Sequence, residues 1–297
     1  MKYTKRFTAA AMAGLIGAMT LVSGGTAYAA TGWQQNGSTY YYYDANGELH
    51  KGWLNTENGY YYLNLSTGKM TVGWEKINNK WYYFQGNGVM ATGWVKDNGK
   101  YYYMLTDGTM HTGWVSIDGV YYYLGDSGAM ATGWVNMDNG WYYFDPNDGK
   151  CTVNSAREIK DSWYMFGSDG KMVTGWQQVD GGYYYFHTDG RMLTGWLSDG
   201  TNSYYMDPAN GRMSTGWKQI ENSYYYFNNS GHKLTGWVQI DGTYYYLNPS
   251  DKGRMAANTT LKIDGVSYTF AANGACTTSN GNALNVSNNN NTNSSTV

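Results

Sequence analysis

A tryptophan directly after glycine recurs throughout the chain, and most of these tryptophans are followed seven positions later by a second aromatic residue. The tryptophans concerned are Trp33, Trp53, Trp74, Trp94, Trp114, Trp134, Trp176, Trp196, Trp217 and Trp237. On two adjacent strands, two such rings can face each other across a hairpin. Aromatic faces attract a quaternary ammonium group, tryptophan most strongly, and desolvation raises the gain to about 2 kcal/mol or more. A sugar ring instead stacks on one flat face. The spacing therefore predicts repeated sites for a cation or a carbohydrate.

Methionine recurs four or five residues before the tryptophan position, and a polarizable thioether can line an apolar floor. We include four of these methionines in the candidate ligand-binding set: Met90, Met110, Met130 and Met192. The alternative is that the tryptophans and their partner rings only pack one hairpin against the next.

Other chemistry is missing from the sequence. The four histidines are 45 to 76 residues apart, so no pair has metal-ligand spacing. Nucleophile-elbow, phosphate-loop and EF-hand patterns are also absent. The net charge of −2 argues against nucleic acid as a partner. We therefore predict no catalytic residue, no metal and no cofactor, and we do not expect an enzyme.

The elements that position these rings are short strands. The Gly-Trp tryptophans are spaced by 20 or 21 residues, except for the 42 between Trp134 and Trp176. Each unit contains a turn such as Asn98-Gly99, and Asn-Gly favours the two positive φ angles of a hairpin turn. A unit this short leaves no room for a helix. The sequence therefore predicts an all-β fold, a β-solenoid of stacked hairpins in repeats of about 20 residues.

Two of the predicted twelve units are degenerate, one near residues 151–170 and one near 255–276, with Ser155 and Thr260 near the missing tryptophans. We number the last four residues of each second strand positions 1 to 4. Position 2 is tyrosine in every unit and position 4 is always bulky. Residues two apart share a strand face, so these positions predict the core. The tryptophan and the aromatic residue at position 1 can vary, which marks them as the binding set.

The two ends differ from the repeats. Residues 1–29 combine a basic start, an apolar run and an Ala-x-Ala site, which predicts a secretory signal peptide. Residues 30–279 hold the repeats, and 280–297 form a tail rich in Asn, Ser and Thr that is expected to be disordered. We predict a secreted protein with no membrane span after signal cleavage.

The full pattern joins Gly-Trp, a Tyr-rich second strand and Met-x-Thr-Gly-Trp. It resembles the choline-binding, or cell-wall-binding, repeat family of Gram-positive surface proteins, and it covers residues 31 to about 276. The resemblance implies a left-handed superhelix with about three hairpins per turn. It also implies a cell-surface protein that binds choline on teichoic or lipoteichoic acid, using two aromatic residues of one hairpin and one of the next.

Carried over to this sequence, the family's aromatic cages pair each tryptophan with the residue at position 1. The best matches are Trp74 with Trp81 and Trp134 with Trp141. Further candidates are Trp53 with Tyr60, Trp94 with Tyr101, Trp114 with Tyr121, Trp176 with Tyr183, Trp217 with Tyr224 and Trp237 with Tyr244.

Position 1 is mostly tyrosine in this chain, whereas the family's choline cages favour tryptophan. Related repeats with tyrosine there bind carbohydrate. The alternative function is therefore an adhesin for an α-glucan or a host glycan, and another cell-wall polysaccharide remains an alternative partner. The sequence does not predict an oligomeric state.

Overall fold

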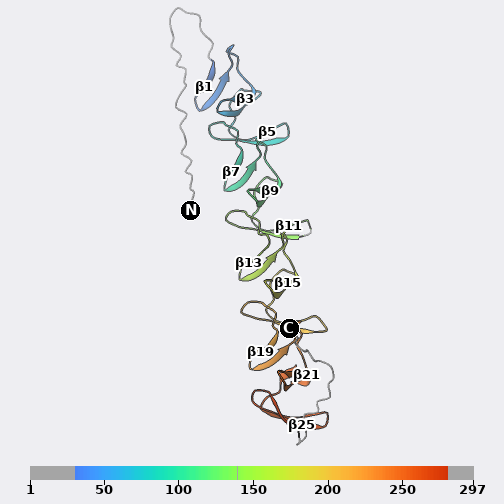
Figure 1. Cartoon of the computed structure of the whole chain (residues 1–297). Coiled ribbons are helices and arrows are strands. Elements are labelled where there is room, and N and C mark those ends of the chain that lie inside the picture. Colours follow the sequence, from blue (N-terminus) through green and yellow to red (C-terminus); the bar gives the residue numbers. More distant parts are fainter. Residues whose placement is uncertain (1–30, 139, 280–297) are drawn as a thin grey trace, which may run out of the picture. The chain divides into compact units, whose positions relative to one another are not determined.

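The computed structural model describes residues 31–138 and 140–279 (Figure 1). The predicted signal peptide and tail lie outside these residues. Within the described part the chain forms β-strands and one 3-10 turn, η1 (Pro249–Asp251), and no α-helix. None of the described segments is therefore a helix of the length and apolarity that a bilayer crossing requires.

The strands are short, and most have five residues. Their bounds are β1 (Gly32–Asn36), β2 (Thr39–Tyr43), β3 (Gly52–Thr56), β4 (Gly59–Leu63), β5 (Gly73–Ile77), β6 (Lys80–Phe84), β7 (Gly93–Asp97), β8 (Lys100–Met104), β9 (Gly113–Ile117), β10 (Val120–Leu124), β11 (Gly133–Met137), β12 (Gly140–Phe144), β13 (Ser155–Ile159), β14 (Ser162–Phe166), β15 (Gly175–Val179), β16 (Gly182–Phe186), β17 (Gly195–Ser198), β18 (Ser203–Met206), β19 (Gly216–Ile220), β20 (Ser223–Phe227), β21 (Gly236–Ile240), β22 (Thr243–Asn248), β23 (Arg254–Met255), β24 (Thr259–Ile263), β25 (Val266–Phe270) and β26 (Cys276–Ser279).

Consecutive strands pair as antiparallel hairpins, and two of these sheets gain a third short strand. The turns have the backbone that the sequence predicted, with φ of 45° at Asn98 and 79° at Gly99. Two positive φ angles give a turn whose twist matches that of the flanking strands. The predicted all-β architecture of repeated hairpins is confirmed.

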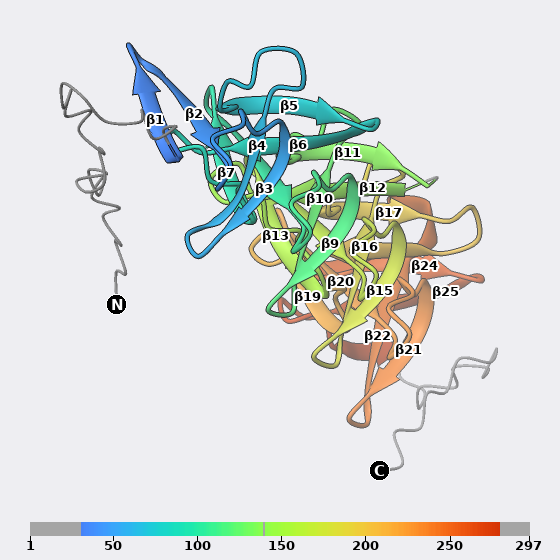
Figure 2. The same ribbon diagram turned by 90° about the horizontal axis from the view of Figure 1, so that it is seen from above.

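The described residues divide into two compact units. The first runs to Asn136 and includes Tyr143–Cys151, and the second comprises Met137–Tyr142 and the residues from Thr152 onwards. Within the first unit, β9 points in the same direction as β3, three hairpins earlier (Figure 2). Within the second unit, β21 repeats the direction of β15 in the same way (Figure 2). Both observations agree with about three hairpins per turn.

Position 4 supplies the core of every hairpin after the first, and its side chain is at most 3% exposed in all of them. The prediction for position 2 holds only in part. Tyr61 and Tyr142 are buried, but Tyr82 and Tyr102 are half-buried. Their rings lie against the tryptophan of the preceding hairpin, as described below, so this position serves two purposes.

Each hairpin is joined to the previous one by the residue at the methionine position. Met90 forms an isolated bridge with Phe84 of its own hairpin. The backbone N–H of Met90 donates to the carbonyl oxygen of Tyr60 in the preceding hairpin, over 2.7 Å. The same link joins Met110 to Trp81. Successive hairpins are therefore held in register by backbone hydrogen bonds as well as by packing.

Candidate aromatic binding sites

Each tryptophan of the repeat lies on the strand face opposite the position 4 core. Trp74 is the second residue of β5 and is the cross-strand partner of Tyr83, at position 3 of β6. Their ring centroids are 5.1 Å apart with an interplanar angle of 71°. Edge-to-face pairs of this kind contribute about 0.5–1.5 kcal/mol beyond their buried area. The tryptophan ring is therefore held on one side by a tyrosine of its own hairpin.

The next hairpin supplies a second wall to most of these tryptophans. The ring of Tyr102, at position 2 of β8, lies 4.7 Å from that of Trp74. Tyr82 lies 5.0 Å from Trp53 in the same way. Equivalent contacts are Trp33–Tyr61, Trp94–Tyr122, Trp176–Tyr204, Trp196–Tyr225, Trp217–Tyr245 and Trp237–Tyr268. Every one of these sites thus combines residues from two successive repeats.

The aromatic residues at position 1 project into solvent beside the tryptophans. Trp81 is 42% exposed, and its ring meets that of Trp74 at 6.4 Å and 88°. Tyr101 meets Trp94 at 6.5 Å and 87°. Two perpendicular rings with an accessible face form a corner that a cation or an apolar group can enter.

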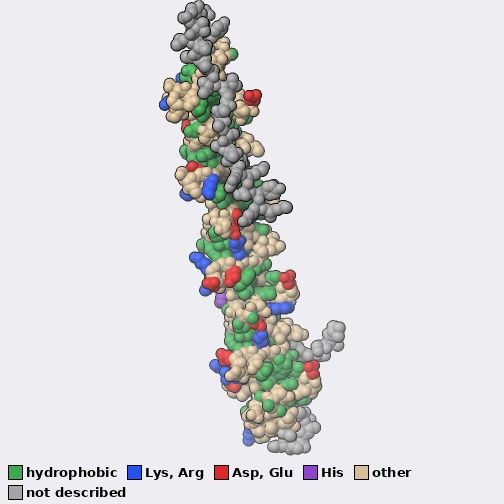
Figure 3. All heavy atoms as spheres, turned by 90° about the vertical axis from the view of Figure 1, so that its left-hand side faces the viewer, with side chains coloured by type: hydrophobic (Ala, Val, Ile, Leu, Met, Phe, Trp, Pro, Cys, Tyr) green, Lys and Arg blue, Asp and Glu red, His purple; other side chains and the backbone are tan. Residues whose placement is uncertain are grey.

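Other predicted pairs are less closely joined. Among the residues that the structure describes, no ring contact joins the pairs Trp53–Tyr60, Trp176–Tyr183, Trp217–Tyr224 or Trp237–Tyr244. In the remaining candidates, Trp114 contacts Tyr123 at 5.4 Å and Trp134 contacts Tyr143 at 5.1 Å, while Tyr121 and Trp141 are exposed. Hydrophobic side chains reach the surface repeatedly in both units (Figure 3).

Comparison with known proteins identifies these repeats. A family model of choline-binding repeats matches residues 71–111, 111–155, 173–215 and 214–260. A model of a putative cell wall binding repeat matches residues 31–49. The chain belongs to the choline-binding repeat family. No curated protein sequence matched the chain.

Solved structures of choline-binding repeat proteins resemble the whole described fold. CbpJ from Streptococcus pneumoniae is 31% identical, with a TM-score of 0.57, and the match covers 83% of this chain and 100% of CbpJ. Choline binding protein F from the same organism, solved in the presence of a peptidoglycan analogue, is 30% identical over 84% of this chain and 100% of its own, with a TM-score of 0.55. The autolysin LytC from Streptococcus pneumoniae is 23% identical, covering 76% of this chain and 52% of LytC at a TM-score of 0.52, and shares the fold.

The methionines of the choline-binding repeats lie under the rings and also lock the next turn. Met110 packs on the same buried cluster as Trp74, Tyr83 and Tyr102, and Met90 packs on the cluster of Tyr62 and Phe84. The thioether ends of Met90, Met110, Met130 and Met192 each fill the place of a Cβ at a turn glycine of the following repeat: Gly108, Gly128, Gly149 and Gly211. These methionines therefore pack one repeat against the next in addition to lining the aromatic rings.

Met192 differs from the other three. Its backbone N–H donates to the carbonyl of Trp163 in hairpin β13–β14. In that hairpin Ala156, next to Ser155, is paired with Met165 and so occupies the tryptophan position. The hairpin to which Met192 is hydrogen-bonded therefore has alanine in place of the Gly-Trp tryptophan.

Two of the aromatic sites in these choline-binding repeats have an aspartate beside them. The indole N–H of Trp74 donates to a carboxylate oxygen of Asp97 over 3.2 Å. The hydroxyl of Tyr204, which contacts Trp176, donates to Asp199 over 2.9 Å. Hydrogen bonds from the backbone N–H groups of Asn202 and Thr201, and from Tyr204, lower the pKa of Asp199 to about 2. Both carboxylates add negative charge beside rings that already favour a cation.

The tyrosines at positions 2 and 3 belong to the site but were not predicted as parts of it. Position 2 was predicted as core, and no role was predicted for position 3. A signal was present for position 3, because it loses its tyrosine where the tryptophan is lost, at Met165 and Thr269. The tyrosine at position 2 contacts the tryptophan of the preceding repeat, and no spacing within one unit indicates that contact.

Proposed function

We propose that this chain is a secreted, non-catalytic protein that attaches non-covalently to the cell surface by binding choline on teichoic or lipoteichoic acid. The observation that carries the proposal is the corner formed by Trp74 and Trp81, closed by Tyr102 of the next hairpin and carrying Asp97 at its edge. A trimethylammonium group meets several electron-rich faces there, and the carboxylate balances its charge.

One such corner binds weakly, because an exposed cation–π contact is worth about 0.5–1 kcal/mol. Repetition compensates for this weakness. A polymer that carries many choline groups can occupy several repeats at once, and avidity then exceeds the affinity of any one site by orders of magnitude. The repeated hairpins support attachment to a polymer more than capture of a single small molecule.

A carbohydrate ligand is the second candidate. Tyr60 is 49% exposed and presents a flat face that is not in ring contact with Trp53, among the described residues. Such a platform suits stacking of a sugar ring. The repeats of one chain can therefore differ in ligand.

Retention on a choline-derivatised resin tests the proposal. We expect the protein to be retained, and free choline but not dextran to elute it. Trp81→Ala should weaken binding at one site severalfold, because it removes one wall of the corner. The matched control is Trp163→Ala, since Trp163 is similarly exposed, at 44% against 42%, but its hairpin has Ala156 in place of the tryptophan.

The possible outcomes separate the two ligands. Elution by dextran alone would replace choline with a glucan as the ligand. Release by neither compound would contradict both functions and leave the rings with a packing role.

A further inference from the structure

The tryptophan site of hairpin β17–β18 differs from the others in its neighbours. Trp196 keeps the usual contacts, with Tyr205 at 5.0 Å and Tyr225 of the next hairpin at 5.2 Å. Position 1, however, is Ser203 instead of an aromatic residue, and the methionine position is Lys233. The site therefore loses a ring and acquires an ammonium group.

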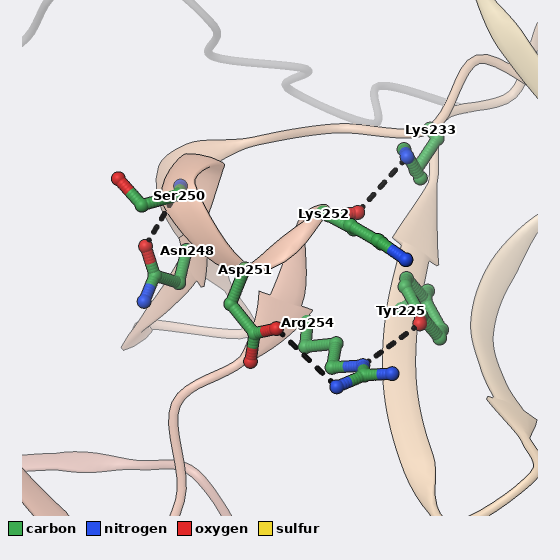
Figure 4. A network of polar contacts seen from close by, with 7 residues as sticks. All are labelled: Tyr225, Lys233, Asn248, Ser250, Asp251, Lys252 and Arg254. Atoms are coloured by element: carbon green, nitrogen blue, oxygen red, sulfur yellow. Dashed lines mark hydrogen bonds and ion pairs between the residues drawn. The ribbon is translucent and has the colours of Figure 1, made fainter.

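Lys233 is held in place by the same links as a methionine. Its backbone forms an isolated β-bridge with Phe227 of its own repeat, and its N–H donates to the carbonyl oxygen of Ser203 in the preceding hairpin over 2.8 Å. Its ammonium lies 5.2 Å from the ring centroid of Trp196. The ammonium also donates to the backbone carbonyl of Lys252 over 2.9 Å (Figure 4). An aromatic face and a carbonyl oxygen thus hold one cation at this site.

The surroundings of Tyr225 add further positive charge. The guanidinium of Arg254 donates to the hydroxyl of Tyr225 over 3.3 Å and pairs with Asp251 over 3.3 Å. Figure 4 shows Lys233, Lys252 and Arg254 gathered around Tyr225. Burial lowers the pKa of Lys233, so its ammonium has already lost part of its hydration. A second cation entering this site meets repulsion from the Lys233 ammonium, which the carbonyl oxygen of Lys252 holds over the Trp196 ring.

Two other lysines lie over aromatic rings, but over the rings at position 1 and not over a Gly-Trp tryptophan. Lys76 lies 5.9 Å from the ring of Trp81, and Lys96 lies 5.1 Å from that of Tyr101. Both rings are at position 1, and each lysine is the cross-strand partner of its ring within one hairpin. Lys233 instead comes from the following repeat and lies over the Gly-Trp tryptophan itself.

We infer that the aromatic site of Trp196 is occupied by the side-chain ammonium of Lys233 and is closed to an external quaternary ammonium ligand. Lys233 is then a specificity-determining residue, because it decides which of the intact repeats binds. The tethered cation has a high effective concentration, which free choline must overcome to displace it. This inference rests on the proposed function for its consequence, although the position of Lys233 can be tested without any ligand.

NMR of the indole N–H groups tests the inference in the full-length protein, with Trp196→Phe and Trp74→Phe used to assign the two signals. On titration with choline chloride we expect the Trp74 signal to shift and the Trp196 signal to stay unchanged. A Trp196 signal that shifts over the same concentration range as that of Trp74 would overturn the inference.

A pair of variants then reopens the site. Lys233→Met combined with Ser203→Tyr restores the residues that the other repeats carry, and we expect the Trp196 indole to become responsive to choline. Ser203→Tyr alone is the matched control and should leave it unresponsive, because Lys233 is still present. Conversely, Met110→Lys should abolish the response of Trp74. Failure of the double variant to respond while Trp74 responds would contradict the inference.

A ligand-free measurement separates this inference from the proposed function. The ε-methylene protons of Lys233 should resonate upfield of their position in the unfolded chain, because they lie near the Trp196 ring, and Trp196→Leu should remove that shift. If no indole responds to choline, the proposed function fails, while the shift still decides where Lys233 lies. Unshifted ε-protons would overturn the inference directly.

Discussion

Hairpins β5–β6 and β13–β14 have the same backbone and different outer faces. Both bury a phenylalanine at position 4, Phe84 at 1% and Phe166 at 0% exposure, and an isoleucine before the turn, at 7% in each. The outer face has Trp74 opposite Tyr83 in one hairpin and Ala156 opposite Met165 in the other. The inner face is therefore common to both hairpins, and the residues opposite each other on the outer face are where they differ.

The turns of the two hairpins reinforce this conclusion. Asn78 and Asn79 have φ of 48° and 64°, and Lys160 and Asp161 have φ of 49° and 61°. The degenerate hairpin therefore closes through the same left-handed pair, although lysine is not favoured in that conformation. The hairpin accommodates this cost although Ala156 occupies the tryptophan position.

Removal of the buried ring is the strongest test of the comparison. Phe84→Ala and Phe166→Ala should each lower the free energy of unfolding by about 3–5 kcal/mol, because each leaves a large cavity in an apolar core. Urea denaturation followed by circular dichroism measures both. A much smaller effect for Phe166→Ala would show that the degenerate hairpin does not share this core.

The contact between methionine and glycine gives a second, smaller test. Gly88 has φ of 80°, and a Cβ there would lie 2.8 Å from Cε of Met70. Gly190, in the turn after hairpin β15–β16, has φ of 83°, and a Cβ there would lie 2.6 Å from Cε of Met172, the methionine of the degenerate hairpin. Gly88→Ala and Gly190→Ala should each destabilise by about 1–3 kcal/mol through backbone strain and displaced methionine.

Gly86→Ala is the matched control, since a Cβ there would meet nothing within 4 Å. We expect it to change the midpoint of thermal unfolding little. An equal loss in Gly86→Ala would show that the methionine contact is not the cause.

The fold was largely predictable because each hairpin is specified locally. Asn98-Gly99 fixes a two-residue turn, and alternation along the second strand identifies position 4 as core. The site was predictable only in part. Tyr102 reaches Trp74 from the next repeat, and that contact depends on the rotation between hairpins, which no local pattern encodes. Lys233 departs from the methionine that most other repeats have at its position, but the consequence appears only once the Trp196 ring is known to lie beside it.

Rebuilding the outer face of the degenerate hairpin is the mildest test. Ala156→Trp with Met165→Tyr restores a cross-strand pair beside Trp163, Met192 and the next hairpin. We expect a gain in stability of about 0.5–1.5 kcal/mol from the aromatic pair and one additional indole that responds to choline. The measurements are thermal unfolding and the NMR titration above.

The control for this gain is Ala156→Leu, which adds apolar surface but no ring. It should leave the number of choline-responsive indoles unchanged. A double variant that is stabilised but unresponsive would show that the outer face needs more than its rings to bind.

The backbone bond from Met90 to the carbonyl of Tyr60, and its equivalents along the chain, also has a mechanical consequence. Such contacts join only neighbouring repeats, so the stability of the array is approximately a sum over repeats and their interfaces. A chain held at several points and pulled would then yield one repeat at a time, with each lost hairpin releasing slack before the next is strained. Duplication or deletion of a whole repeat leaves every remaining junction intact, so the length of the array can change in evolution without redesign of the fold.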